Sequence, residues 1–176
     1  MPNFRRRYAP GGRWFFTVNL LDRKKRLLVE NIDALREAVA ATMRRYPFRI
    51  DAFVVLPDHL HAIWTLPEGD SDFSTRWRLI KTRFARAIPK TEALNSARTA
   101  KGERGVWQRR FWEHMIRDDD EFGRYAEYCM INPVKHGYVR KPVDWPHSSF
   151  HRELRRGNVT EDWGADIDMA GDWGER

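Results

Sequence analysis

Two apolar stretches joined by a two-residue turn constrain the fold of this chain more than any other feature. Residues 48–56 and 59–66 are rich in β-branched and aromatic side chains, and Pro57-Asp58 separates them. Such a pair of strand-forming stretches predicts a β-hairpin. Alternate residues of a strand point to the same face of the sheet, so the side chains of His59 and His61 converge while Leu60 points to the opposite face.

Apolar side chains at alternating or helical spacing predict the other elements: a strand at 14–20, a helix from 31 or 33 to about 46, a basic amphipathic helix at 72–88, a strand within 107–116, and a helix that starts at 118–120 and ends before 133. Residues 89–106 are poor in large apolar side chains and predict a linker. The order β-α-β-β-α-β-α predicts an α+β fold with a ferredoxin-like (RRM-like) antiparallel sheet and helices packed on one face.

Composition excludes several classes of protein. The chain has 176 residues, 41% of them hydrophobic, which is enough for one packed domain and too many for a disordered chain. Its longest apolar runs are far shorter than the ~20 residues of a membrane-spanning helix, and no signal-peptide core follows Met1, so we expect a cytoplasmic protein that does not bind membranes. A single cysteine, Cys129, excludes an internal disulfide and a multi-cysteine zinc site.

Charge is segregated along the chain. Lys and Arg number 32 against 25 acids, a net charge of +7, but residues 160–176 carry −5, which leaves +12 for residues 1–159. Basic stretches interleaved with aromatic residues are typical of nucleic-acid binding, although a solvated helix face beside core aromatics gives the same pattern. We expect residues 161–175 to compete with DNA for the basic surface. The DNA-binding candidates are Arg5, Arg6, Arg7, Arg13, Arg76, Arg78, Lys81, Arg83, Arg86, Arg109 and Arg110.

The histidine pair and the last predicted helix suggest a catalytic site. Two imidazoles on one strand face can coordinate a divalent cation, although such a pair is often incidental. Tyr128 and Asn132 are four residues apart and share a helix face. With an amide oxygen from Asn132, the donor set suits Mg²⁺ or Mn²⁺, and Tyr128 would be a covalent nucleophile. The alternative is a core tyrosine and a helix-capping asparagine, and Tyr125 is a second candidate nucleophile.

Several ordered blocks of the sequence carry a resemblance to a known family: RRRYAPGGRWFFTVNL, VVLPDHLHAIWTLPEGD, FSTRWRLIKTRF, VWQRRFWEHMIRDDDEF, YCMINPVKHGYV and DWPHSSFHRELRRG. They resemble the REP-associated tyrosine transposases, which belong to the single-tyrosine HUH superfamily. The resemblance implies that Tyr128 is the nucleophile and that His59, His61 and Asn132 bind the metal. Insertion-sequence relatives often have Gln where this chain has Asn132, whose side chain is one methylene shorter.

The resemblance also implies the reaction. It indicates a metal-dependent single-stranded DNA endonuclease and strand transferase that cleaves hairpin-forming repetitive extragenic palindromes (REP elements) through a 5′-phosphotyrosine, without a nucleotide cofactor. We expect a nucleoid-associated monomer or homodimer, with residues 1–150 as the transposase domain and 151–176 as a C-terminal tail, acidic from about 160. Two alternatives are a hairpin-binding module without turnover and a metal-dependent hydrolase that uses water as the nucleophile.

Overall fold

The structure is a computed structural model that describes residues 11–90 and 104–165. Its strands are β1 (Arg13–Asn19), β2 (Arg49–Val55), β3 (His59–Thr65) and β4 (Trp112–Ile116). Its helices are α1 (Leu27–Glu30), α2 (Ile32–Arg45), α3 (Phe73–Ala87), α5 (Asp119–Lys135), the 3₁₀ helix η1 (Pro142–Asp144) and α6 (Phe150–Arg155). None of the helices within these described ranges is long and apolar enough to cross a membrane.

The four strands form one antiparallel sheet in the order β2-β3-β1-β4. This order, with α2 after β1 and α3 after β3, is that of a ferredoxin-like fold, so the predicted α+β class is confirmed. Strands β2 and β3 are the predicted hairpin, and their register shifts between Ile50 and Ala52.

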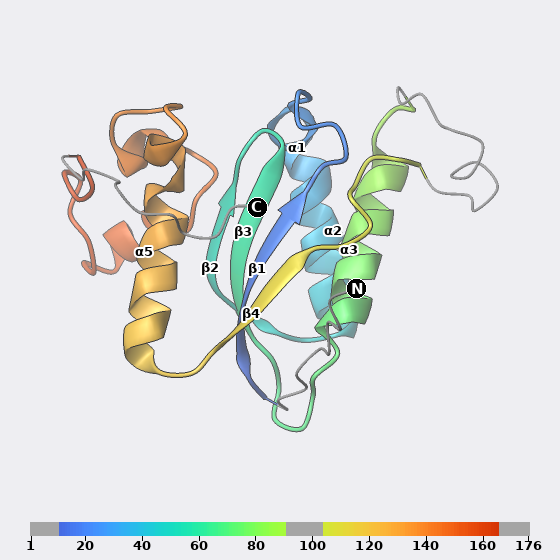
Figure 1. The fold of residues 1–176 in the computed structure, drawn as a ribbon, viewed down its shortest axis with the longest axis horizontal. Coiled ribbons are helices and arrows are strands. Elements are labelled where there is room, and N and C mark those ends of the chain that lie inside the picture. The colour runs from blue at the N-terminus through green and yellow to red at the C-terminus, as the bar shows by residue number, and fades with distance from the viewer. Residues whose placement is uncertain (1–10, 91–103, 166–176) are drawn as a thin grey trace, which may run out of the picture.

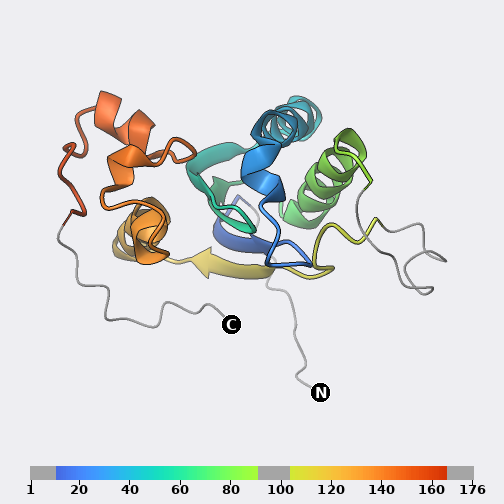
Figure 2. The same ribbon diagram turned by 90° about the horizontal axis from the view of Figure 1, so that it is seen from above.

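Helices lie on both faces of the sheet. α2 and α3 pack side by side on one face, as expected, while α5 lies over the other face (Figures 1 and 2). The expectation of helices on one face therefore describes α2 and α3 but not α5. The strand sequences explain the second layer, because β1 alternates Trp14 and Phe16 on the α2/α3 face with Phe15 on the α5 face.

The α2/α3 face carries the larger apolar cluster. Trp64 of β3 stacks on Trp77 of α3 at 4.1 Å and packs on Phe48 at 4.1 Å, and all three side chains are buried. Leu60 also lies in this cluster and is fully buried, as the alternation of β3 predicts. Close packing of large rings on this face fixes the strands from which the opposite face is built.

Helix α5 continues through Pro133 to Lys135, so the expectation that it ends before this proline is wrong. Pro133 lies in the last turn, where the missing N–H removes a single bond, that to the carbonyl of Cys129. Gly137 follows the C-cap His136 and adopts a φ of 69°, and the backbone N–H of Tyr138 donates to the carbonyl of Pro133 at 3.0 Å. This is a Schellman cap.

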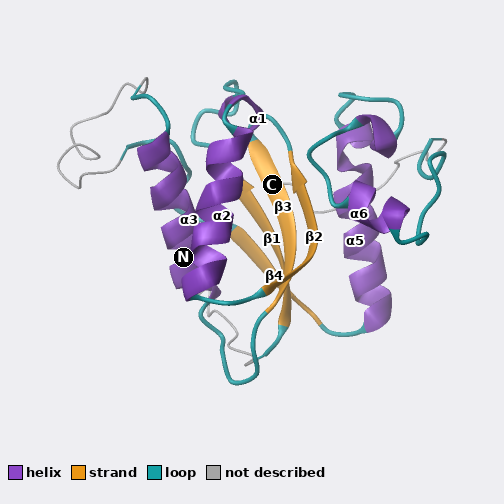
Figure 3. Cartoon of the chain, turned by 180° about the vertical axis from the view of Figure 1, so that it is seen from behind, coloured by secondary structure: helices purple, strands orange, loops and turns teal. Residues whose placement is uncertain are grey.

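The two edges of the sheet differ. Beside β2, the chain after η1 runs alongside the strand (Figure 3): the N–H of Val55 donates to His147 O at 2.9 Å, and the N–H of Ser149 donates to Phe53 O at 2.7 Å. At the other edge, β4 pairs with β1, and no other described strand pairs with it. One edge is therefore covered by backbone hydrogen bonds, and the β4 edge is not covered by another described strand.

Candidate active site

The histidine pair lies on the α5 face of the sheet. His59 and His61 are 1% and 0% exposed, and their ring centroids are 5.0 Å apart. The register places His61 opposite Thr17 and His59 opposite Asn19 of β1. The predicted convergence of the two imidazoles is confirmed.

The Nδ1 atom of each imidazole is engaged by the surrounding protein. Thr17 Oγ1 lies 2.9 Å from Nδ1 of His61, and the carboxylate of Asp58 accepts a hydrogen bond from Nδ1 of His59 at 2.8 Å. A proton held on Nδ1 makes Nε2 the basic nitrogen of His59, and metal-binding histidines are commonly oriented by such a carboxylate. Burial lowers the pKa of His59, although its bond to Asp58 opposes this, so the neutral ring is favoured.

Asp58 is in turn held by Arg23, whose Nε donates to the Asp58 carboxylate. Burial raises the pKa of Asp58, but its hydrogen bonds with His59 and Arg23 outweigh burial and bring this pKa down to about 2. Asp58 therefore stays ionised at neutral pH and fixes the orientation of the His59 ring.

Helix α5 brings the predicted nucleophile to the histidine pair. Tyr128 is 3% exposed, and its ring centroid lies 5.1 Å from that of His61. Two turns later, the ring of His136 lies 5.0 Å from that of His59. Asn132 lies one turn from each of these residues on the same helix face, which places it over the pair.

The amide of Asn132 is the clearest sign of an additional ligand. The side chain is fully buried, and among the described residues neither its oxygen nor its nitrogen has a hydrogen-bond partner. Buried amides are rarely left unpaired unless a water or an ion completes them. Two imidazoles and one amide oxygen fit Mg²⁺ or Mn²⁺ with positions open for substrate. No cluster of three or more His, Cys, Asp or Glu in the described part of the chain could hold a metal ion.

Lys135 adds a positive charge beside Tyr128. Its Nζ lies 3.5 Å from the Tyr128 hydroxyl and 4.9 Å from the ring centroid. Lys135 is two helical turns after Tyr128 and so lies on the same side of α5. An ammonium group in this place stabilises negative charge on the phenol oxygen.

The predicted DNA-binding residues fall into several environments. Arg5, Arg6 and Arg7 lie outside the described residues, as do residues 166–176 of the acidic tail. Arg13 packs on the ring of Phe122 at 4.1 Å. Arg83 donates to Thr42, and Lys81 donates to Gln108 O at 2.6 Å, while burial lowers the pKa of Lys81 to about 8. The exposed members are Arg78, Arg86, Arg109 and Arg110.

Arg76 is a correction to the sequence-based prediction. It is 1% exposed, and its guanidinium donates five hydrogen bonds, two of them to the carboxylate of Asp70 and the others to backbone carbonyls that include Tyr46 O and Pro47 O. All its N–H donors are thereby used. Arg76 ties α3 to the end of α2 and cannot contact DNA phosphates.

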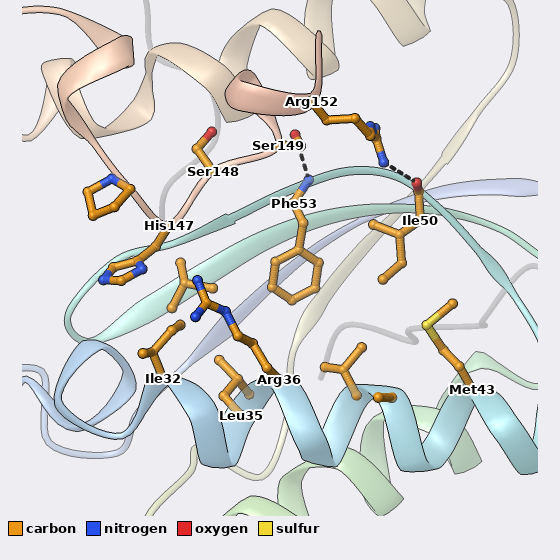
Figure 4. A pocket seen from close by; sticks show the side chains of 14 residues that line it. Ile32, Leu35, Arg36, Met43, Ile50, Phe53, His147, Ser148, Ser149 and Arg152 are labelled. Carbon is orange, nitrogen blue, oxygen red and sulfur yellow. Dashed lines mark hydrogen bonds between the residues drawn. The ribbon is translucent and has the colours of Figure 1, made fainter. Parts of the chain in front are cut away.

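An apolar pocket lies away from the histidine pair (Figure 4). Ile32, Leu35 and Met43 of α2 face Phe53 of β2, and the segment around Ser149 closes the side. The volume is about 320 Å³, and none of the predicted catalytic residues lines it. His147 lines this pocket and His151 contacts Trp145 O, so both stand apart from the candidate active site.

Sequence reasoning missed four residues that support the site: Thr17, Arg23, Asp58 and Lys135. Lys135 could have been found, because its spacing of seven from Tyr128 places both on one helix side. Thr17 depends on the register between β1 and β3, and Arg23 comes from a loop without a periodic pattern. Asp58 was assigned only to the hairpin turn.

Comparison with known proteins connects this geometry to a family. No family model matches the chain. A REP-associated tyrosine transposase of Escherichia coli (strain K12) is 47% identical over 167 residues, which cover 95% of this chain and 93% of the relative. A relative from Haemophilus influenzae, whose name assigns it to the same family, is 45% identical over 170 residues, which cover 96% of this chain and 97% of that one.

A solved structure agrees. It is described as the REP-associated tyrosine transposase bound to a REP hairpin, and it shares 45% of its sequence with this chain, covers 100% of both chains and superposes with a TM-score of 0.81. Identity at this level over the full length is accompanied by the same fold. The chain therefore belongs to the family of REP-associated tyrosine transposases, which are enzymes that act on DNA.

Proposed function

We propose that this protein cleaves and rejoins single-stranded DNA that folds into REP-type hairpins, through a covalent bond between Tyr128 and a 5′-phosphate. The observation that carries the proposal is the contact of Tyr128 with His61, together with the buried, unpaired amide of Asn132 one helical turn after Tyr128. The solved relative, which is bound to a REP hairpin, supports this class of substrate. The nucleoid would be the place of action.

The chemistry follows from the side chains around Tyr128. Its hydroxyl oxygen attacks the phosphorus of the scissile diester, a tyrosyl phosphodiester forms, and the bond from phosphorus to the 3′-oxygen breaks. The 3′-oxygen takes up a proton and leaves as a free hydroxyl, and the phenol gives up its own proton. Lys135 stabilises the charge that develops on the phenol oxygen. The tyrosyl phosphodiester retains the energy needed to join a second strand, so no nucleotide cofactor is required.

His59, His61 and Asn132 would hold a divalent ion, Mg²⁺ or Mn²⁺, with Asp58 and Thr17 orienting the two rings. Such an ion supplies Lewis-acid polarisation of the scissile phosphate. The protein's own contribution is to bury the three donors on a rigid sheet and helix, so that a bound phosphate lies next to the phenol of Tyr128.

The test is an adduct assay with hairpin DNA from the host's repetitive palindromes, carrying unpaired flanks and incubated with Mg²⁺ or Mn²⁺. We expect a protein–DNA adduct on a denaturing gel with the wild type and with Tyr125→Phe, a matched control one turn away. Tyr128→Phe should form none. An adduct with Tyr128→Phe would disprove the nucleophile, free 5′-phosphate ends would indicate hydrolysis by water, and binding without cleavage would indicate a module without turnover.

A further inference from the structure

The basic surface of the protein and its candidate active site lie on different sides of the sheet. A cavity of about 480 Å³ between α3 and residues 104–111 is lined by basic side chains that include Arg78, Arg86 and Arg109. Helix α3 covers the face opposite to α5 (Figure 2), whereas Tyr128 belongs to α5. Residues 104–111 of this groove lead into β4, so DNA whose phosphates bind there can reach Tyr128 around the β4 edge of the sheet.

Trp112 stands at that edge. It is the first residue of β4, directly after Arg109, Arg110 and Phe111, and it is 37% exposed, although most large apolar side chains of the described residues are buried. Strand pairing places Trp112 opposite Thr17 of β1, which is itself opposite His61 of β3. Residues opposite one another across strands share a face, so Trp112 lies on the active-site face, about 10 Å or two strand spacings from His61.

The indole ring is held in place by its neighbours. It stacks parallel on the ring of His114, at 5.8 Å and an interplanar angle of 6°, and meets Phe15 edge-on at 5.6 Å. His114 is fixed by a hydrogen bond of 2.9 Å to the buried carboxylate of Glu121. Phe15 in turn stacks on His61 at 5.5 Å. A partly exposed ring that is fixed in this way offers an aromatic surface at little entropic cost.

We infer that Trp112 is the platform on which one unpaired base of single-stranded DNA stacks, next to the phosphodiester that Tyr128 attacks. This inference rests on the proposed function. Proteins that bind single strands combine cationic side chains for the backbone with aromatic rings for the bases, and Arg109 and Arg110 supply the cations immediately before Trp112. Stacking there holds the flank of the hairpin as it turns from the basic groove to the active site, and so selects which phosphodiester meets Tyr128.

The experiment is a cycle between protein and DNA variants. Hairpin DNA with unpaired flanks is changed to an abasic site at one flanking position at a time, and affinity is measured by fluorescence anisotropy in EDTA, where no cleavage is expected. We expect one abasic position to weaken wild-type binding about tenfold. Trp112→Ala should lose about as much on intact DNA and should be insensitive to that position. Trp112→Phe should recover most of the loss, and Leu21→Ala, another exposed apolar side chain, should bind as the wild type does.

The salt dependence of binding distinguishes the contribution of base stacking from that of ionic contacts with phosphates. Arg110→Gln should reduce the slope of log Kd against log salt concentration by about one, whereas Trp112→Ala should leave the slope unchanged. The indole is partly exposed, so Trp112→Ala should unfold at nearly the wild-type temperature.

Three results would overturn the inference. The first is that Trp112→Ala binds like the wild type, and the second is that its loss adds to that of every abasic position. The third is that, by light scattering, Trp112→Ala dissociates a wild-type dimer while its abasic response stays intact, which would assign Trp112 to a contact between two copies of the chain. A wild-type protein that binds no hairpin DNA would overturn the proposed function as well, so the two failures can be told apart.

Discussion

The two faces of the sheet come from the same strands but serve different purposes. On β3, Leu60 and Trp64 enter the apolar cluster beneath α2 and α3, while His59 and His61 lie under α5. Both faces are buried, yet one contains aromatic and aliphatic packing and the other contains polar groups held by Asp58 and Thr17. The α5 face also has an apolar cluster, which includes Phe15 and Ile63, but it is smaller than the cluster beneath α2 and α3. The larger cluster can stabilise the sheet on which the buried polar groups of the candidate site are held.

The largest effect should come from the α5 face and should fall on activity. His61→Ala removes one of the proposed metal donors, and we expect adduct formation to decrease more than about 10³-fold, a barrier increase of about 4 kcal/mol. Mn²⁺ should raise the melting temperature of the wild type and not of this variant. His147→Ala, a histidine in the apolar pocket of Figure 4, should keep wild-type activity. A variant that fails to fold would contradict the division between the two faces.

A substitution on the α2/α3 face should lower the free energy of unfolding and should leave activity nearly unchanged. Trp64→Ala empties the space between Trp77 and Phe48, and we expect the free energy of unfolding to decrease by about 4 kcal/mol. Urea denaturation monitored by circular dichroism measures this loss. Adduct formation per folded molecule should change less than about threefold, because Trp64 points away from the histidine pair. Wild-type stability together with lost activity in Trp64→Ala would contradict the proposed division between the two faces.

Two arginines of α3 sharpen the contrast within one helix. Arg76→Met leaves the Asp70 carboxylate and the carbonyls of Tyr46 and Pro47 without their donor, which should destabilise the fold by about 3 kcal/mol. Arg86→Gln changes an exposed side chain and should leave stability unchanged while weakening DNA binding severalfold at low salt. If DNA binding by folded Arg76→Met depends less on salt concentration than binding by the wild type does, Arg76 contacts DNA after all.

The smallest effect concerns the acid side of the stability profile. The pKa of Asp58 falls from 3.8 to about 2 on folding, so its ionised form contributes stability above pH 4, and this contribution is lost as the pH falls through about 2. Without metal, the wild type should be more stable than Asp58→Asn by about 2 kcal/mol at pH 5. The two unfolding free energies should converge near pH 2. A constant difference over this range would show that the carboxylate charge is not what holds His59.

Local periodicity predicted much of the fold and of the site. The alternation of His59, Leu60 and His61 placed two rings in the site and one side chain in the core, and the spacing of Tyr128 and Asn132 placed both on one side of α5. The buried position of Arg76 could also have been predicted, because it lies three residues after Phe73 and four before Ile80, on the apolar side of its helix. Its charge led to the assignment to the surface, since the partners Tyr46 and Pro47 come from another part of the chain.

The face that α5 occupies could not be predicted in this way. It depends on how the chain leaves β4, and on apolar residues such as Phe15 and Ile63 that give each strand a second buried side. The supporting contacts of Thr17 and Arg23 likewise follow from register and from loop geometry. Those are tertiary properties, which no window of sequence contains.

The position of α5 in the chain has a consequence for how the protein is made. All four strands and both helices of the apolar layer are synthesised before α5, so the sheet can assemble while Tyr128 is still inside the ribosome. A nascent chain that stops before Asp119 contains His59 and His61 and much of the basic surface, but has no Tyr128. With Tyr128 as the proposed nucleophile, a nascent chain at this stage would lack the residue that cuts DNA.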